Sequence, residues 1–310
     1  MVKRFLSVLL SGLLLVSCGL GGSDALKVNI DRALKHPAGA RDVYTEATAI
    51  PLRCPAGMDL GQELRLLDVA PDRFILLDDG KNEIQVFDWY GDFVTAIGRE
   101  ATILDGSVYG DQVLTVLTED AILEYSTADG AFLVEYPVRD KDVMWKSVAR
   151  ATENGIFMIG VRDGTAYGGG YIIDRDYYYS EAWHAPDYLV SRAHLPADEV
   201  ENSRFFRCGD TVYSFLSRSG QIDKYTEDFF ICVPYQWDFG RRHPVFTNVQ
   251  KTADRIYLAF ELDGERAVLI YDLKSPRYKS VLQSEFPLGI IYDGCNYAFA
   301  RGEIIRHTLR

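Results

Sequence analysis

Short runs of β-branched and aromatic residues, separated by polar turns, dominate the chain from about residue 64 to its end. The clearest copy of this pattern lies in residues 73–99, where strand-like runs occupy 74–77, 83–88 and 93–97. Between them, Gly stands beside Asp or Asn and supplies the backbone geometry of a tight turn. The stretch therefore predicts three consecutive antiparallel strands.

Weaker copies of this stretch predict six units of up to four strands each. The units begin near residues 64, 107, 147, 203, 247 and 288, and we expect Gly168 to Gly170 to break the third unit. The sixth unit has only three strands, while an isolated strand at 46–53 precedes the first unit. We expect this N-terminal strand to complete the last unit, because a closed ring has no loose sheet edge.

The fold class that this arrangement predicts is an all-β, six-bladed β-propeller of four-stranded antiparallel blades. It would occupy residues 46–310, which is 265 residues or about 44 per unit, near the usual length of a propeller repeat. A pair of β-sandwiches is the competing fold. It would not explain a spare strand at one end of the chain and a missing strand at the other.

The N-terminus has the pattern of a bacterial lipoprotein signal. Lys3 and Arg4 precede an apolar stretch of about a dozen residues, which is too short to span a bilayer comfortably. The sequence Leu15-Val16-Ser17-Cys18-Gly19 then resembles a lipobox, whose cysteine carries a diacylglycerol thioether and becomes the mature N-terminus. An ordinary secretory signal with an incidental cysteine is the alternative interpretation.

This signal divides the chain into three parts. Residues 1–17 are expected to be a lipoprotein signal peptide, residues 18–45 a lipidated N-terminus and linker, and residues 46–310 the propeller. Acyl chains on Cys18 would hold the protein at the membrane, at about 0.8 kcal/mol per buried methylene. No transmembrane helix is needed for this anchorage.

Two groups of motifs carry a resemblance to a known family. Residues 74–78, 84–88, 90–94 and 97–99 resemble the first blade of the six-bladed β-propeller lipoproteins of Gram-negative bacteria, whose fold is related to NHL-type and TolB-like propellers. Ile50-Pro51-Leu52 is similar to the motif that ends the N-terminal strand in that family. The resemblance implies the propeller fold and a location in the cell envelope, with the outer membrane as the expected site. It implies no defined activity, since fold does not fix function.

Charge argues against one class of partner. The formal net charge is −12, and it becomes about −14 when Lys3 and Arg4 leave with the signal peptide. Such a surface repels phosphate backbones, so we expect no nucleic-acid partner.

The cysteines that remain after lipidation are expected to be buried, unpaired thiols. An envelope location permits disulfides. However, the expected register places Cys208 three strands from Cys232, and Cys54 two strands from Cys295. Strands lie about 4.8 Å apart, whereas disulfide formation needs Cα atoms within about 7 Å.

The sequence contains none of the common metal-binding or nucleophile motifs. The five histidines, His36, His184, His194, His243 and His307, form no HExxH motif and no His/Cys cluster at zinc spacing. No GxSxG or SxxK motif is present. We therefore predict no catalytic residue, no metal site and no cofactor. A lyase or hydrolase remains the alternative, because a propeller brings distant inter-blade loops together around its axis.

Two aromatic segments are the candidate ligand-binding surfaces. Their candidate residues are Tyr178, Trp183 and His184 in the first segment, and Trp237, Arg241 and Arg242 in the second. Tyr and Trp offer flat apolar faces with a polar tip, which suits sugar rings and peptide side chains, and an arginine suits a carboxylate. The competing interpretation is structural: strand alternation would turn Tyr177 and Tyr179 into the sheet and Tyr178 outward, with both arginines solvated.

These observations favour a lipid-anchored binding or scaffold module of the cell envelope. Its ligand would be a glycan, a peptide or a partner protein, held on one face of the disc near the axis. The alternatives are a propeller-based lyase or hydrolase and a purely structural partner in a larger envelope complex.

Overall fold

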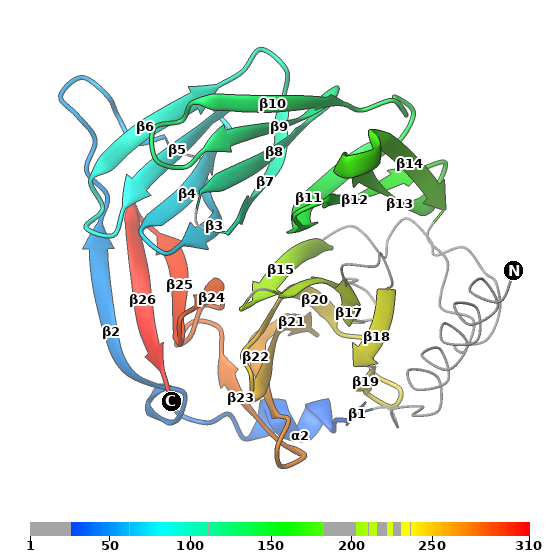
Figure 1. Ribbon diagram of the computed structural model, residues 1–310. Helices are drawn as coiled ribbons and strands as arrows, with labels where there is room; N and C mark the ends of the chain where they lie inside the picture. Colours follow the sequence, from blue (N-terminus) through cyan, green and yellow to red (C-terminus); the bar gives the residue numbers. More distant parts are fainter. Residues whose placement is uncertain are drawn as a thin grey trace, which may run out of the picture.

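The computed structural model describes residues 26–310, except 62, 111, 183–202, 210, 216–221, 226–230 and 236. Within these residues, strand pairing gives six four-stranded antiparallel sheets and one two-stranded sheet. Figure 1 shows the four-stranded sheets arranged around a central axis. The chain is therefore an all-β propeller built from four-stranded antiparallel blades.

The strands of the first three sheets follow one another in chain order. The first sheet contains β3 (Leu64–Ala70), β4 (Arg73–Asp78), β5 (Glu83–Asp88) and β6 (Phe93–Gly98). The second contains β7 (Ile103–Tyr109), β8 (Val113–Thr118), β9 (Ala121–Ser126) and β10 (Phe132–Pro137). The third contains β11 (Met144–Thr152), β12 (Gly155–Arg162), β13 (Thr165–Ile172) and β14 (Tyr177–Ala182), with a short 3-10 helix η2 (Ile173–Arg175) before β14.

The other three sheets include the one that joins the two ends of the chain. The fourth sheet contains β15 (Arg204–Cys208), β16 (Thr211–Phe215), β17 (Ile222–Tyr225) and β18 (Ile231–Tyr235). The fifth contains β20 (Val245–Lys251), β21 (Arg255–Leu262), β22 (Glu265–Asp272) and β23 (Arg277–Leu282). The last contains β24 (Ile290–Tyr292), β25 (Cys295–Ala300), β26 (Glu303–Leu309) and, beside β26, the N-terminal strand β2 (Tyr44–Pro51).

The innermost strand is the first strand of each of the first five sheets and β24 in the last sheet, where β2 forms the opposite edge. These strands contact one another in the order β3, β7, β11, β15, β20, β24 and back to β3. Five blades are recognised from their geometry, one fewer than the six that the sequence predicts. Hydrogen-bond pairing of the described strands nevertheless gives six four-stranded sheets.

The N-terminal strand completes the last sheet, as the sequence predicts. β2 pairs antiparallel with β26 from Tyr44 opposite Leu309 to Pro51 opposite Glu303. Just beyond β2, the Arg53 N–H donates to the Gly91 carbonyl at 2.8 Å, and the Phe93 N–H donates to the Arg53 carbonyl at 3.1 Å. The last sheet is thereby joined to the first.

The segment before β2 packs on the propeller. It contains β1 (Leu26–Lys27), the helix α2 (Ile30–Lys35) and the 3-10 helix η1 (Ala40–Asp42). Asn29 caps α2 by accepting the Arg32 N–H at 2.9 Å, and the helix buries Ile30 and Ala33 in a cluster shared with the fourth and fifth sheets. β1 pairs in parallel with β19 (Trp237–Asp238). No helix within the described residues has the length and apolar character needed to cross a membrane.

The core lies between neighbouring sheets, so the central strands are covered on both faces. Four successive residues of β4, 74–77, are completely buried. Ile75 and Leu77 pack with the second sheet, while Phe74 and Leu76 pack with the last sheet. Burying a side chain of this size contributes about 1.5–3 kcal/mol. The apolar run 74–77 predicted from the sequence thus forms the contacts of the first blade with both of its neighbours.

One expectation about the third sheet is wrong. Gly168 to Gly170 lie inside the paired strand β13 and do not break it. A Cβ on Gly170 would come within 1.9 Å of the Ile156 carbonyl oxygen, and one on Gly169 within 2.5 Å of the Trp145 ring. Glycine at these two positions allows close packing.

Within the described side chains, Cys54, Cys208 and Cys295 are unpaired, as expected, although only Cys295 is fully buried. Cys208 lies on β15 and Cys232 on β18, the first and fourth strands of one sheet, as expected. The side chain of Cys232 lies outside the described residues.

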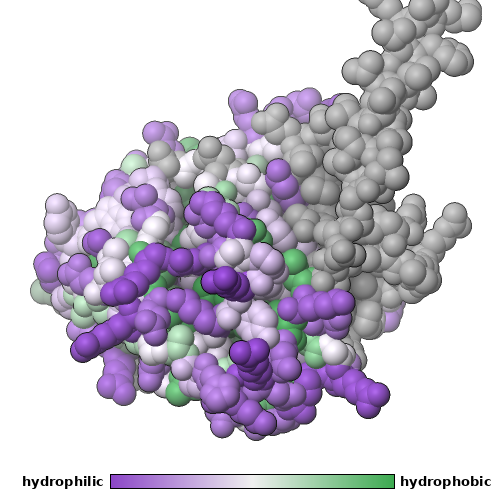
Figure 2. All heavy atoms as spheres, turned by 90° about the horizontal axis from the view of Figure 1, so that it is seen from below, coloured by the Kyte–Doolittle hydropathy of each residue, from purple (hydrophilic) through white to green (hydrophobic). Residues whose placement is uncertain are grey.

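Figure 2 shows the molecule from the edge where α2 and β23 lie in Figure 1. Hydrophilic side chains prevail on this face, and hydrophobic ones appear only in small areas between them.

Candidate functional site: an axial cavity

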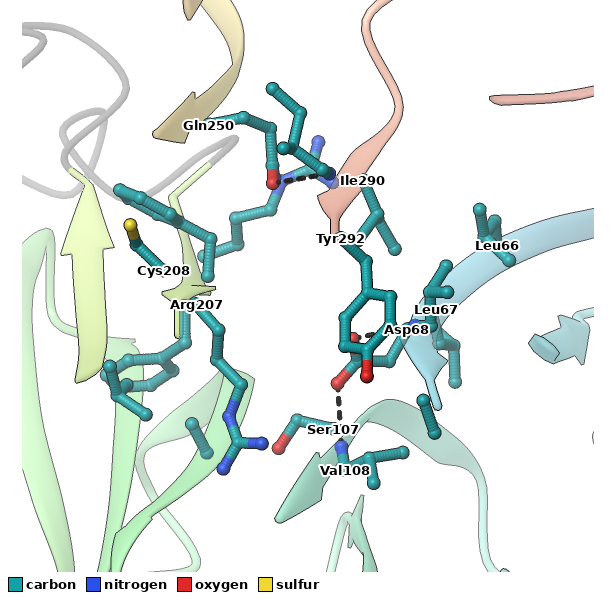
Figure 3. Close-up of a pocket in the computed structure, with 18 of the residues that line it drawn as sticks. Leu66, Leu67, Asp68, Ser107, Val108, Arg207, Cys208, Gln250, Ile290 and Tyr292 are labelled. Carbon is teal, nitrogen blue, oxygen red and sulfur yellow. Dashed lines mark hydrogen bonds between the residues drawn. The ribbon is translucent and has the colours of Figure 1, made fainter. Parts of the chain in front are cut away.

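A cavity of about 620 Å³ lies where the innermost strands meet. Residues from β3, β7, β11, β15, β20 and β24 line it, so all six four-stranded sheets contribute to its wall. Figure 3 shows Asp68, Ser107, Arg207, Gln250 and Tyr292 around this space.

Short polar side chains of the inner strands bind the backbone of the next blade. The Asp68 carboxylate on β3 accepts the Val108 N–H of β7 at 2.7 Å. The Asp105 carboxylate on β7 accepts the Ser147 hydroxyl at 2.6 Å and the Val148 N–H at 3.1 Å, both on β11. These two carboxylates therefore connect the first three blades across the cavity wall.

Similar side-chain hydrogen bonds join the remaining blades around the ring. Ser147 Oγ accepts the Phe205 N–H of β15 at 3.3 Å, and Arg204 Nη2 donates to the Thr247 carbonyl of β20 at 2.9 Å. Gln250 Oε1 then accepts the Ile291 N–H of β24 at 3.0 Å. Inter-blade hydrogen bonds thus lead from β3 to β24 without a gap.

Burial shifts the pKa values of the charged groups in this wall. Desolvation raises the pKa of the Asp68 carboxyl, and the charge of Arg207 opposes that effect. Desolvation also raises the pKa of Asp105, opposed by the Ser147 hydrogen bond and by Arg65, and it lowers the pKa of the Arg204 guanidinium.

Two further cations, besides Arg204, lie on the wall formed by β15 and β20. The Arg207 guanidinium lies 5.5 Å from the Tyr109 ring centre, and no hydrogen bond or ion pair joins it to another described residue. Lys251 Nζ donates to the Thr252 carbonyl at 3.0 Å and lies 3.9 Å from Cys208 Sγ.

Uncharged groups complete the wall. Apolar side chains reach the cavity from β3, β15 and β24: Leu66, Leu67, Phe205, Phe206 and Ile290. Ser107 Oγ is buried and has no hydrogen-bond partner among the described residues. Within the described chain, no group of three or more His, Cys, Asp or Glu side chains is placed to hold a metal ion.

The first predicted aromatic segment lies on the outermost strand of the third sheet, away from the axial cavity. Tyr178, which the alternation rule turned outward, is half-buried and packs edge-on against Tyr171 with ring centres 5.5 Å apart. Burial raises its pKa to about 12. Tyr177, expected to face the sheet, is 55% exposed instead. The alternation was assigned in the opposite sense for these two side chains.

The second predicted segment is largely engaged within the protein. Trp237 stacks on Phe239 with ring centres 6.1 Å apart and meets Tyr271 edge-on at 5.4 Å. Arg242 forms ion pairs with Asp31 and with Asp263, and its side chain remains 37% exposed. Arg241 is exposed.

The remaining predicted residues, Cys18, Trp183 and His184, lie outside the described residues. Tyr178 and Trp237 belong to different core clusters, so the structure does not bring the two described segments together. None of the predicted residues that are described lines the axial cavity.

The cavity was not predicted from the sequence, because a site was expected in the loops between blades, whereas the innermost strands supply most of the cavity wall. The signal was a polar side chain inside an otherwise apolar first strand, as in Leu67-Asp68-Val69 and Leu104-Asp105-Gly106. A buried polar group needs a partner. In the first strand of a blade, the nearest partner is the backbone of the next blade.

Comparison with known proteins shows the fold and no family. No protein-family model and no curated protein matches the chain. The lipoprotein family suggested by the sequence motifs therefore remains a resemblance.

Solved structures are similar in architecture only. A protein from Bacteroides fragilis that is described as exported is 13% identical, with a TM-score of 0.61 over 88% of this chain and 87% of that one. A member of the DUF4221 family from Bacteroides vulgatus is 8% identical, with a TM-score of 0.57 over 86% and 97% of the two chains. A streptogramin B lyase is 10% identical, with a TM-score of 0.51 over 88% of this chain and all of the other. These similarities support a β-propeller.

Proposed function

We propose that this protein is a lipid-anchored binding module of the cell envelope and that its ligand occupies the axial cavity. A glycan, a peptide or a segment of a partner protein would enter from one face of the disc. The propeller would have six blades, closed by β2, and Cys18 would hold it at the outer membrane.

The observation that carries the proposal is the cavity itself. Its volume of about 620 Å³ lies within the range of about 300–1,000 Å³ that ligand sites occupy. Its wall combines apolar side chains with a few polar groups that converge on one space, namely Ser107 and Arg207. This combination is typical of a site that both holds and orients a ligand.

The location rests on the N-terminal signal. Lys3, Arg4, the apolar stretch and the lipobox at Cys18 agree with one another. The similar protein from Bacteroides fragilis, described as exported, is compatible with that location.

An enzyme is the second candidate, and one observation favours it. Asp68 and Asp105 are two carboxyls with raised pKa values in one cavity, and perturbed carboxyls cluster at catalytic sites. Both, however, accept backbone hydrogen bonds that join blades. A lyase such as the streptogramin B lyase of similar fold would need one of them to release that structural bond.

A ligand screen tests the proposal on the full chain in detergent. The panel holds glycans, peptidoglycan fragments and short peptides, and a ligand at 100 times its Kd should raise the free energy of unfolding by about 2.7 kcal/mol. Ser107→Phe, which fills the cavity, should abolish the shift. Thr102→Phe, on an exposed residue, is the matched control and should preserve it.

Two results would count against the proposal. One is a ligand whose affinity is unchanged by Ser107→Phe, since its site must then lie elsewhere. The other is the absence of any shift across the panel. Turnover of a panel member, abolished by Asp68→Asn or Asp105→Asn in a folded protein, would favour the enzyme.

A further inference from the structure

We propose that the axial cavity recognises a carboxylate, which Arg207 and Ser107 bind together. The inference rests on the proposed function and names the chemistry of its ligand. It is carried by two polar groups that face the same space and have no hydrogen-bond partner among the described residues.

Arg207 is a cation with unused hydrogen-bonding capacity. Its side chain starts from β15, the residue is half-buried, and neither an ion pair nor a hydrogen bond ties it to another described residue. A guanidinium has five N–H donors in a planar fork that matches a carboxylate. Taking such a group partly out of water without a partner is costly, so an incoming anion would restore what burial removes.

Asp68 does not meet this need. Its carboxylate oxygens accept the Val69 N–H at 2.8 Å and the Val108 N–H at 2.7 Å. It influences Arg207 electrostatically but forms no ion pair with it among the described residues. In Figure 3 the two side chains reach toward the cavity from opposite sides. The space between them is open to a ligand.

Ser107 provides the second contact. Its hydroxyl is buried with no hydrogen-bond partner in the described part of the chain, and Figure 3 shows it beside the Arg207 guanidinium. The guanidinium can donate two parallel hydrogen bonds to a carboxylate, while the hydroxyl donates a third. The two groups come from β15 and β7, so the site requires the folded ring.

Among the neighbours of Arg207, the Asp68 carboxylate disfavours a doubly charged anion. A dianion such as a phosphate monoester would be repelled by the nearby Asp68 carboxylate more strongly than a carboxylate would. Apolar side chains such as Leu67 and Phe205 line the same cavity and suit the uncharged body of the ligand. A peptide C-terminus and a uronic acid both offer this combination.

Four probes distinguish the effect of ligand charge from that of ligand shape, and a peptide ligand from a sugar ligand. They are an alanine tripeptide with a free C-terminus, the same tripeptide amidated, a galacturonic acid trimer and its methyl ester. Binding to the full chain in detergent is measured by calorimetry. We expect one of the two free acids to bind at least tenfold more tightly than its neutral counterpart.

Variants of Arg207 and Ser107 test whether these two residues cause the preference for an acid. Arg207→Gln should weaken binding of that acid at least tenfold, and Ser107→Ala by about threefold, while Arg207→Lys should retain part of the affinity. Arg266→Gln is the matched control, because Arg266 is exposed and pairs with Glu261 on the surface. Should Arg207→Gln fail to fold, Ser107→Ala and the comparison of acid with neutral probe still decide.

Three results would overturn the inference. They are equal binding of acid and neutral probes, unchanged affinity in a folded Arg207→Gln variant, and failure of both acids to bind. If neutral probes bind as well and Ser107→Phe abolishes that binding, the proposed binding function stands and the carboxylate inference alone fails.

Discussion

The Ser147 hydroxyl donates a hydrogen bond of 2.6 Å to the Asp105 carboxylate and at the same time accepts the Phe205 N–H at 3.3 Å. Three blades therefore meet through two side chains. Apart from the backbone bonds of Arg53 to Gly91 and Phe93, the described blades form separate sheets, so contacts of this kind and apolar packing hold the blades in register.

Removing the Asp105 carboxylate should destabilise the whole ring. Asp105→Ala leaves the Ser147 hydroxyl and the Val148 N–H without their acceptor, and we expect a loss of about 2–4 kcal/mol in the free energy of unfolding. Urea denaturation followed by tryptophan fluorescence measures it. Asp254→Ala removes an exposed carboxylate paired with Lys274 and should leave stability nearly unchanged. Equal stability of the two variants would refute the role of Asp105.

Gly91 tests the seam between the last and first blades. It has φ of +81°, and a Cβ at this position would lie 2.2 Å from the Pro51 carbonyl oxygen at the end of β2. Gly91→Ala should cost about 2–5 kcal/mol, since the left-handed backbone and the overlap both oppose the methyl group.

Gly110 is the matched control for the seam. It has φ of +57°, and no atom lies within 4 Å of the position that an added methyl group would take, so Gly110→Ala isolates the backbone cost of about 1–2 kcal/mol. Calorimetric unfolding compares the two variants. If Gly91→Ala is no more harmful than Gly110→Ala, the contact with Pro51 does not constrain the seam.

His307 should make the protein less stable as the pH falls. The side chain is buried, its Nδ1 lies 3.3 Å from Asn296 Nδ2, and desolvation lowers its pKa in the folded state. The unfolded chain has the ordinary histidine pKa of about 6.5, so below that pH it binds a proton that the folded state excludes. Stability is unaffected above about pH 7.5 and is lost progressively below pH 6.5, by up to about 1.4 kcal/mol per pH unit.

The contribution of His307 can be isolated by difference. His307→Gln keeps an acceptor for Asn296 and removes the titrating ring. Denaturation curves between pH 5 and pH 8 should show the wild-type free energy falling relative to that of the variant as the pH drops. A constant difference across this range would mean that His307 does not exclude a proton in the folded state.

Cys18→Ala should release the protein from membranes. The lipobox interpretation assigns anchorage to acyl chains on this thiol, each buried methylene contributing about 0.8 kcal/mol. Fractionation of cells that express the full chain should find the wild type with membranes and the variant in the soluble fraction. Membrane association of the variant would instead implicate the apolar N-terminal stretch or a protein partner.

The strands and their turns could be predicted from the sequence because each follows from neighbours in the chain. In the turn 78–82, Asp78 Oδ1 accepts the Lys81 N–H at 3.2 Å and Asn82 adopts φ of +52°, as a sequence of Asp, Gly and Asn suggests. The closing strand was equally visible, because the last unit lacked one strand. Both predictions rest on residues close together in the chain and on the number of strands in each unit.

The cavity could not be predicted in the same way, because it depends on contacts between blades. Asp105 and Ser147 stand 42 positions apart, and nothing near either one shows that they meet. Asp263 likewise pairs with Arg242 across 21 positions, which turned an expected ligand contact into an internal one. The role of the glycines of β13 was predicted wrongly for a similar reason: their small size is required by Ile156 on the neighbouring strand β12 and by Trp145 on β11, two strands away.

The arrangement of β1, α2 and β2 has a mechanical consequence. A pull on the chain ahead of Leu26 reaches β1 first, which is held by two residue pairs to β19, and then the packed helix α2. Only after both have yielded does the load reach β2, whose seven paired positions with β26 resist as a shear joint. Detachment of β1 and α2 would thus take up a pulling force on the N-terminus before the strand β2, which closes the ring, is loaded.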